Sequence, residues 1–392
     1  MNIKTFCTFS LGISSSFYFA TYLTQKGTIS TLPLILAGLA TLGLMYLPSI
    51  KGELRKLSRN EKLWIGLLFA YGIWGCLTVW MDNAAVNHYE IPAKFILGAI
   101  IAIPILKYGI PLYWIKAGVI FGFLSLAWLI LQEYNGTKFS PIMNATKWGN
   151  AVAFQTMLAA SLTYIERSLW QKIVFIGLAS FGIYATAIIG TRGAFLPLLA
   201  MTGILSVLAT IQFGKKAVII AITSIVVLAF GLSQLDITKT RLRAAVNDFN
   251  LMQKDTHNTS IGVRLIMWKG GLEAGLKDPI IGHGYNFKEV FETYKANTPG
   301  EQKTVNLIRD GGRLFHNVYI DTFVTKGLIG ILIFFSLLII GLKSPSIQKF
   351  ILILPATIGI AFAGLSDSTL ALGITSTYFV VAGTILKATI SK

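Results

Sequence analysis

The sequence predicts an all-α polytopic membrane protein of about twelve transmembrane helices that carries a partly helical cap. Hydrophobic residues make up 54% of the 392 residues and charged residues only 13%, whereas about 25% of the residues of a soluble domain are charged. The apolar residues form unbroken runs near the length of about 20 residues that a helix needs to cross a bilayer. A membrane barrel would instead need segments of alternating polarity.

The apolar runs define twelve spans, although a short fourth span and a tight link after the seventh leave the count open by one or two. The predicted spans are 4–24, 28–48, 63–81, 92–107, 112–132, 149–165, 172–190, 194–212, 216–234, 317–342, 348–365 and 369–388. Three regions follow from them. Residues 1–234 hold spans one to nine, residues 235–315 form a large polar loop or cap, and residues 316–392 hold spans ten to twelve.

Basic residues are distributed unevenly between the two sides of these spans. With the N-terminus inside, the inside loops hold 15 Lys and Arg residues against three acidic ones, Glu53, Glu61 and Glu166. Lys and Arg of short loops concentrate on the cytoplasmic side, so we expect both termini in the cytoplasm and the large loop outside. The same distribution explains the net charge of +17, so we expect membrane lipids as neighbours and no nucleic-acid partner.

The 235–315 segment carries 12 basic and 9 acidic residues, which predicts a small folded cap on the bundle. The segment from Ser260 to Pro279 predicts an interfacial helix, with Ser260 as its possible N-cap and Pro279 just past its end. No acidic cluster indicates a metal site, and no motif indicates a cofactor. Cys7 and Cys76 lie inside apolar runs, where we expect them to pack without forming a disulfide.

The first candidate site residue is Arg192, in the link Gly190-Thr191-Arg192-Gly193 between two spans. An unpaired charge near membrane depth is costly, so an arginine there is a functional candidate. The flanking glycines let the backbone turn tightly and approach a ligand. The alternative interpretation is an arginine that extends to the interface from a helical hairpin.

The second candidate is Arg264, which we place in the first turn of the helix that follows Ser260, where a helix N-terminus favours anions. The glycines of Gly282-His283-Gly284 follow this helix and suggest a turn near a ligand. For His283 itself the simpler interpretation is a structural turn residue.

The third candidate is His316, directly before the tenth span. Counting about 20 residues back from Leu342 starts the hydrocarbon core near Phe323, which places His316 roughly 10 Å above it, at the headgroup level. Histidine can accept a proton near neutral pH. Asp321 does not share a helix face with His316, and we predict packing roles for Asp321 and Lys326. Asp367, in the outer loop 365–368, either caps the next helix or belongs to the site.

Basic groups beside a histidine at the outer headgroup level suit a lipid-attached phosphate or diphosphate. Arginine suits phosphate because its planar fork donates two hydrogen bonds at once. No pair of half-broken helices at the midplane is expected, which disfavours a transporter.

The segments around Arg192, Arg264 and His316, in this order along the chain, resemble the O-antigen ligase and polymerase superfamily of bacterial envelope proteins. The resemblance covers about residues 175–330 and includes Thr191-Arg192-Gly193, Arg264 with Met267-Trp268, and the 278–284 stretch. Its most specific element is His316-Asn317, nine residues, and then Gly327, which is similar to the ligase pattern of histidine, a small amide or hydroxyl residue, nine residues and glycine. The first 170 or so residues match only in hydropathy.

The resemblance implies an O-antigen ligase of the bacterial inner membrane with its active site on the periplasmic face. Such a ligase transfers polysaccharide from undecaprenyl diphosphate to the lipid A–core oligosaccharide of lipopolysaccharide. The transfer would be metal-independent and inverting, on a fold of the membrane-embedded GT-C kind and without a cofactor. His316 would be the general base, and Arg192 and Arg264 would bind the donor diphosphate and stabilise it as it leaves. The further candidate substrate-binding residues are Arg309, Arg313, Asn317 and Asp367.

Two other functions stay open. A polymerase of the same superfamily would extend glycan on the same lipid carrier, although polymerases often have two sizeable outer loops and the 133–148 loop is short. A transporter or flippase would need polar residues inside the bundle, where only Lys116, Asp321 and Lys326 are charged away from the ends of the predicted spans.

Overall fold

The computed structural model describes residues 2–24, 27–47, 54–133, 145–214, 239–240, 243, 246–247, 250–251, 259–285, 287–292, 294–311 and 315–390. Eleven of the twelve predicted spans contain helix, and the ninth span, 216–234, lies outside the described residues. The only strands in the described part are β1 (Ile110–Pro111) and β2 (Thr389–Ile390), which pair in parallel with Ile110 opposite Thr389. The all-α class predicted from the apolar runs is therefore confirmed.

The elements fall into three sets along the chain. The N-terminal set is α1 (Ile3–Thr21), α2 (Gly27–Leu44), α4 (Arg59–Met81), η1 (Val86–Tyr89), α5 (Glu90–Tyr108), α6 (Leu112–Glu133), α7 (Ala145–Ile165), α8 (Leu169–Ile189), η2 (Arg192–Ala194) and α9 (Phe195–Phe213). The middle set is α12 (Ser260–Lys277), α13 (Phe287–Glu292) and α14 (Pro299–Gly311). The C-terminal set is α15 (Val318–Leu342), α16 (Ile347–Ala363), α17 (Gly373–Thr377), the π-helix η3 (Tyr378–Ala382) and α18 (Gly383–Ala388).

The outer surface of the bundle is apolar, as expected for helices that face lipid. Six helical segments of the described chain are long and apolar enough to cross a membrane: Arg59–Met81, Val86–Tyr108, Leu112–Glu133, Leu169–Ile189, Phe195–Gln212 and Val318–Leu342. Large hydrophobic side chains such as Trp128, Leu199 and Ile211 are more than half exposed in the isolated chain. An apolar surface of this extent identifies a multi-pass membrane protein.

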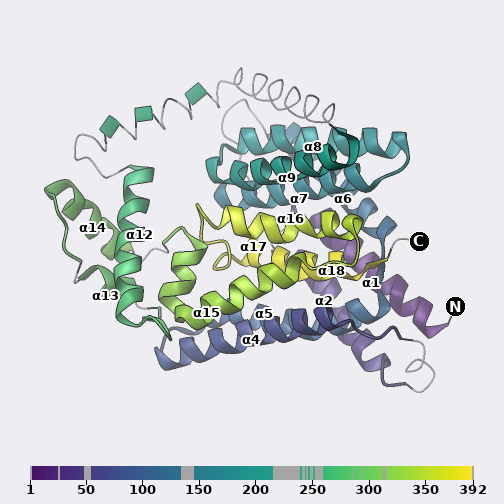
Figure 1. Cartoon of the computed structure of the whole chain (residues 1–392), viewed down its shortest axis with the longest axis horizontal. Coiled ribbons are helices and arrows are strands. Elements are labelled where there is room, and N and C mark those ends of the chain that lie inside the picture. Colours follow the sequence, from purple (N-terminus) through teal and green to yellow (C-terminus); the bar gives the residue numbers. More distant parts are fainter. Residues whose placement is uncertain are drawn as a thin grey trace.

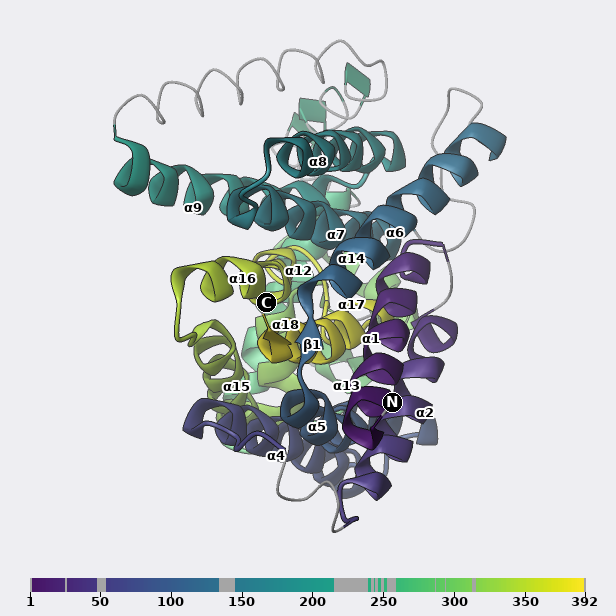
Figure 2. The same cartoon turned by 90° about the vertical axis from the view of Figure 1, so that its right-hand side faces the viewer.

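The bundle helices run side by side along the long axis of the molecule, and α12 crosses one end of them together with α13 and α14 (Figure 1). We call this end the cap end. Both chain termini lie at the opposite end, where β1 joins α5 to α6 (Figure 2). We call it the basic end, because among the described residues it gathers Lys4, Arg55, Lys56, Arg59, Lys62, Lys107, Arg167, Lys172, Lys343, Lys349 and Lys387.

The C-terminal stretch runs through the centre of the bundle. Tyr378 is fully buried, and its ring lies 4.9 Å from that of Tyr22 and 5.2 Å from that of Phe154. The predicted continuous span 369–388 is wrong at its start, because the helix begins only at Gly373 and contains a π-helical turn. The residues before it form the loop that carries Asp367.

The helix α15 is broken at Gly327, inside the predicted tenth span. Gly327 has φ 62° and ψ −163°, a conformation available in practice only to glycine. The break frees backbone groups that pair with the 278–285 loop. The His283 N–H donates to Val324 O (2.7 Å), and the Leu328 N–H donates to Pro279 O (2.8 Å).

The predicted turn is present, and the glycines of this loop have a structural role in it. A methyl group at Gly282 would lie 2.6 Å from Gly327 N, and one at Gly284 would lie 2.6 Å from the Asp82 carboxyl carbon. Both positions have positive φ, and the close approach is to the protein's own backbone and Asp82.

The cap helix α12 lies in the predicted segment and ends before Pro279, but its N-cap is Thr259 and not Ser260. The Thr259 side chain accepts the Gly262 N–H at 3.1 Å, and its backbone is extended, whereas Ser260 is already helical. Arg264 is consequently the fifth residue of α12, just beyond the first turn. The cap has a small core of its own in which Met267, Phe291 and Val305 pack with Phe315. Cys7 is buried in the main core and Cys76 is partly buried, and both are free thiols, as predicted.

Candidate functional site

His316 lies in a short segment that is pinned to the loop following α16. Asn317 caps α15, because its Oδ1 accepts the N–H groups of Tyr319 and Ile320, and its Nδ2 donates to Leu365 O at 3.2 Å. The Val318 N–H donates to Gly364 O at 2.8 Å. His316 itself has φ 51°, an uncommon conformation for a residue with a side chain. The segment is thus held in one conformation by contacts on both sides of the histidine.

The His316 ring faces a buried carboxylate. Its Nδ1 lies 3.3 Å from Asp367 Oδ1, long for a hydrogen bond but within reach of one. The His316 side chain is 40% exposed, whereas that of Asp367 is 4% exposed. A carboxylate at Nδ1 favours the tautomer that carries its proton there, which leaves Nε2 to accept a proton. The pair therefore has the arrangement of a general base and its orienting group.

Asn150 is a third member of this group, and the sequence analysis missed it. It lies in α7, is 1% exposed, and donates from Nδ2 to Asp367 Oδ2 at 3.2 Å. The Ser368 N–H donates to Asp367 Oδ1 at 3.0 Å. The signal that could have found Asn150 is an amide near the start of an otherwise apolar span, since polar groups inside a membrane bundle are costly.

The Arg192 link reaches the same loop. Gly190, in the left-handed conformation, ends α8, and the Thr191 hydroxyl donates to Ala145 O at 2.8 Å. A methyl group at Gly193 would lie 2.4 Å from Ser366 Oγ. The backbone on either side of Arg192 thus packs against α7 and against the neighbour of Asp367. The Arg192 side chain and Arg313 lie outside the described part of the structure.

Arg264 approaches the histidine segment from the cap. It is half-buried, and it precedes Trp268 by one turn on the same face of α12. The Trp268 Nε1–H donates to the carbonyl oxygen of Phe315, the residue before His316, at 2.9 Å. A methyl group on Gly271, one turn further on, would lie 2.8 Å from the Phe315 ring. This face of α12 therefore rests on the segment that carries the histidine.

Arg309 belongs to a more distant part of the cap. It is half-buried on α14, which packs on α12 and α13. The Tyr294 hydroxyl donates to Glu301 Oε1 at 2.5 Å, and burial together with this carboxylate raises the pKa of that hydroxyl above its ordinary value. The Tyr294 hydroxyl therefore stays protonated and anchors the start of α14.

Asp321 and Lys326 have the packing contacts predicted for them. Asp321 Oδ1 accepts the Phe315 N–H at 2.9 Å, so this buried carboxylate also holds the segment before His316. Lys326 Nζ lies 3.2 Å from the Tyr285 hydroxyl and over the rings of Tyr71 and Tyr285. These contacts tie the 278–285 loop to α15 and α4.

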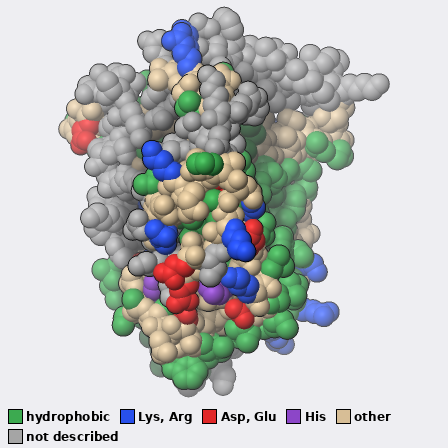
Figure 3. All heavy atoms as spheres, turned by 90° about the vertical axis from the view of Figure 1, so that its left-hand side faces the viewer, with side chains coloured by type: hydrophobic (Ala, Val, Ile, Leu, Met, Phe, Trp, Pro, Cys, Tyr) green, Lys and Arg blue, Asp and Glu red, His purple; other side chains and the backbone are tan. Residues whose placement is uncertain are grey.

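Charged and polar side chains cluster at the cap end, next to apolar surface. In Figure 3, Lys, Arg, Asp, Glu and His side chains cluster on this face, and hydrophobic side chains lie beside them. Among the described residues, no three His, Cys, Asp or Glu side chains are close enough to hold a metal ion. The residues that do converge there are a histidine with a carboxylate and an amide, bordered by the Arg192 link and the Arg264 helix.

Two comparisons with known proteins give matches. Residues 173–335 match a family model described as O-Antigen ligase. The matched interval contains Arg192, Arg264 and His316 and ends before Asp367. A curated protein of Haemophilus influenzae (strain ATCC 51907 / DSM 11121 / KW20 / Rd), described as "Uncharacterized protein", is 26% identical over 340 residues, which cover 82% of this chain and 81% of that protein.

Proposed function

From its match to the O-antigen ligase family model over residues 173–335, we propose that the chain is an O-antigen ligase of lipopolysaccharide assembly. Members of this family are glycosyltransferase-like enzymes that act on lipid-linked sugars. In our proposal the donor is polysaccharide on undecaprenyl diphosphate, and the acceptor is the lipid A–core oligosaccharide. The observation that carries the proposal is the His316–Asp367 pair at 3.3 Å.

His316 acts as the general base in this proposal. Its Nε2 takes the proton of the acceptor hydroxyl while that oxygen attacks the anomeric carbon of the donor sugar. The bond between the anomeric carbon and the diphosphate oxygen breaks, and its electron pair leaves with the diphosphate. Attack on the face opposite the leaving group inverts the anomeric centre. A positioned base typically contributes 10²–10⁴-fold, and Asp367 keeps the ring in the orientation and tautomer that this step needs.

Arg192 and Arg264 bind the diphosphate. Displacement increases the negative charge on the leaving group, and fixed guanidinium groups beside it lower the barrier. Two contacts support this role. The backbone of the Arg192 link packs against Ser366, the neighbour of Asp367, and one face of α12 packs against Phe315, the neighbour of His316. Arg309 and Arg313 are proposed to contact the acceptor or donor sugars. Asn317 contributes by holding its loop, since both ends of its amide are engaged within the protein.

The orientation in the membrane follows from charge. The basic end faces the cytoplasm, because Lys and Arg concentrate there. The cap end then faces the periplasm of the bacterial inner membrane, where both lipid-linked substrates would be presented. Membrane lipids surround the apolar flank of the bundle, and the donor enters from them.

The test is the lipopolysaccharide pattern of a strain that lacks this gene, complemented with variants. Bare lipid A–core with polymer left on the lipid carrier indicates a ligase, whereas core carrying one repeat unit indicates a polymerase. We expect His316→Ala to leave bare core. We expect Asp367→Asn to reduce transfer by the purified enzyme roughly 10- to 100-fold, the usual effect of losing an orienting partner.

A matched control for Asp367→Asn is Glu90→Gln, which removes an exposed carboxylate at the cap end that pairs with Lys94. This variant should transfer glycan like the wild type. Persistent full-length lipopolysaccharide with His316→Ala would show that His316 is not the base. Equal activities of Asp367→Asn and Glu90→Gln would remove the orienting role of Asp367.

A further inference from the structure

The basic end holds a pocket of ≈ 610 Å³ between the start of α1, the segment before α4 and the turn from α5 to α6. Three basic residues line it, Lys4, Arg55 and Lys107, and no acidic residue does so among the residues described. The elements that line it lie at the end of the bundle opposite the cap helices α12, α13 and α14 (Figures 1 and 2). The glycan-transfer chemistry proposed above therefore does not use it.

The pocket is built to hold negative charge. Arg55 is fixed in place, because its guanidinium binds both oxygens of Glu61 (2.7 and 3.2 Å) and its Nε–H donates to Leu106 O at 2.8 Å. Glu61 offsets Arg55, and Lys4 and Lys107 bring two further positive charges to the lining. The first turn of α1 adds the partial positive charge of a helix N-terminus, and the hydroxyl-bearing residues Thr5 and Thr8 lie in the lining.

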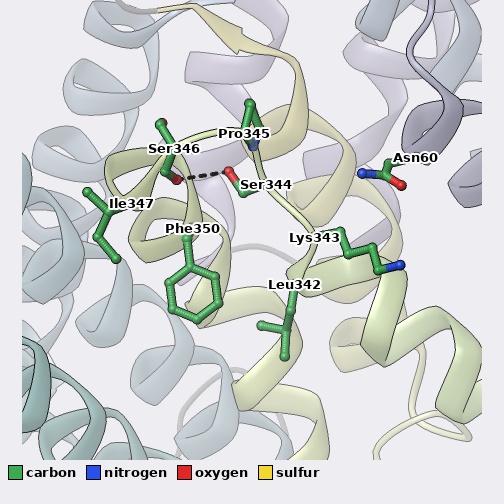
Figure 4. A pocket seen from close by; sticks show the side chains of 8 residues that line it. All are labelled: Asn60, Leu342, Lys343, Ser344, Pro345, Ser346, Ile347 and Phe350. Atoms are coloured by element: carbon green, nitrogen blue, oxygen red, sulfur yellow. Dashed lines mark hydrogen bonds between the residues drawn. The ribbon is translucent and has the colours of Figure 1, made fainter.

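A second pocket at the same end also has a helix N-terminus and hydroxyl groups, but it holds fewer cations. It has a volume of ≈ 570 Å³ and contains one cation, Lys343 (Figure 4). Its Ser344 hydroxyl donates to Ser346 O at 3.1 Å, as the dashed line in Figure 4 marks. The concentration of cations is therefore a property of the first pocket and not of every hollow at the basic end.

The surroundings of the first pocket indicate a lipid as the source of the anion. Phe6, Phe9, Ile13 and Phe17 on α1 are each 40–49% exposed and follow one another at helical spacing. This apolar stripe begins at the pocket, because Phe9 also lines it. Tyr113, another lining residue, is 59% exposed, and tyrosine is enriched at membrane–water interfaces.

We propose that this pocket binds the phosphate headgroup of an anionic phospholipid of the cytoplasmic leaflet, with the acyl chains lying along the α1 stripe. Basic pockets between membrane helices on the cytoplasmic side are suited to such headgroups. The proposal is independent of the ligase assignment. Its failure would leave the cap-end site unaffected, and loss of the ligase assignment would not alter the pocket.

The test measures thermal unfolding of the full-length protein in detergent with added phosphatidylglycerol, phosphatidylethanolamine or inorganic phosphate. A ligand that binds the folded state raises the unfolding temperature in a concentration-dependent way, so titration gives an apparent affinity. We expect phosphatidylglycerol to stabilise the wild type more than the other two additives. Lys107→Gln should weaken its apparent affinity roughly five-fold, and Lys4→Gln with Lys107→Gln should weaken it further.

The matched control is Lys62→Gln, which removes the same charge from an exposed position at the basic end that does not line the pocket. Unfolding without lipid shows whether each variant folds. An equal loss of affinity in Lys62→Gln would mean that general surface charge attracts the lipid, and it would overturn the proposal. Equal stabilisation by phosphatidylethanolamine would also overturn it. Equal stabilisation by inorganic phosphate would assign the pocket to soluble anions and reject the lipid.

Discussion

Replacing Gly327 with alanine tests whether the break in α15 is needed for activity. The backbone at this residue has φ 62° and ψ −163°, and an added methyl group would lie 2.2 Å from the Ile280 carbonyl oxygen. It would also lie 2.4 Å from the Ile280 carbonyl carbon, so the contact is with backbone that no rotamer change can relieve. Either α15 or the 278–285 loop must move in the variant.

The magnitudes decide which of them moves. A residue other than glycine held in this conformation costs about 1–3 kcal/mol. Four backbone hydrogen bonds dock the loop on α15: His283 and Gly284 N–H to Val324 O, Leu328 N–H to Pro279 O, and Ile329 N–H to Ile280 O. Each is worth about 0.5–1.5 kcal/mol net. If α15 closes into a regular helix, its own hydrogen bonds replace those that it loses, so we expect the variant to release the loop and keep the bundle folded.

Release of the loop should impair glycan transfer, because the loop continues directly from α12. That helix carries Arg264 and rests on Phe315 through Trp268. A shift of about 1 Å in a positioning group can cost roughly 10²-fold in rate. We therefore expect Gly327→Ala to lower transfer by the purified enzyme about 100-fold or more.

Three measurements separate this explanation from simple unfolding. Transfer should fall, tryptic cleavage at the exposed Lys277 should accelerate, and the unfolding temperature of the bundle should change little. Gly203→Ala in α9 is the control, because a methyl group there meets nothing within 4 Å. Wild-type transfer and wild-type protease resistance in Gly327→Ala would refute the claim that the break positions the cap.

Further predictions concern the surroundings of His316. Asn150→Ala should lower transfer several-fold, because Asp367 Oδ2 loses its donor at 3.2 Å. Asn150→Asp should lower transfer more, because it places a second carboxylate beside Asp367. Equal rates for the wild type and both variants would contradict this prediction. Trp268→Phe should cost about 1 kcal/mol of stability through the lost bond to Phe315 O, measured by denaturant unfolding against Trp170→Phe, whose indole is 72% exposed. Transfer should survive EDTA, and loss of activity that added Mg²⁺ or Zn²⁺ restores would contradict a metal-independent reaction.

The helices of the bundle could be predicted from the sequence because their cause is local. A run of apolar residues long enough to cross the bilayer must be helical, since lipid offers no partner for backbone N–H and C=O groups. The predicted 317–342 and 348–365 spans differ from α15 and α16 by at most two residues at either end. At the start of α12 the local signal was ambiguous, because Thr259 and Ser260 are both good N-caps and only the backbone conformation distinguishes them.

The break in α15 could not be predicted, because its cause is distant in the sequence. A glycine in an apolar run is compatible with an unbroken helix, and nothing near Gly327 indicates that the 278–285 loop packs against it. The short helices α13 and α14 were missed for a related reason. They are held by the cap core and by contacts such as Tyr294 with Glu301, and their own segments carry no long apolar run.

The site divides in the same way into a local part and a part that depends on the fold. His316 could be singled out from its own neighbourhood, whereas Asp367 lies 51 residues later and was left open between a cap and a site role. A carboxylate that is only 2% exposed must be stabilised by donors. Asp367 meets Asn150 from α7, the Ser368 N–H of its own loop and the ring of His316. Because these groups come from three separate segments of the bundle, the proposed base and its orienting partners are assembled by the bundle. The cap contributes the other proposed site residue, Arg264. A variant that loosens the cap should therefore weaken diphosphate binding while the His316–Asp367 pair stays in place.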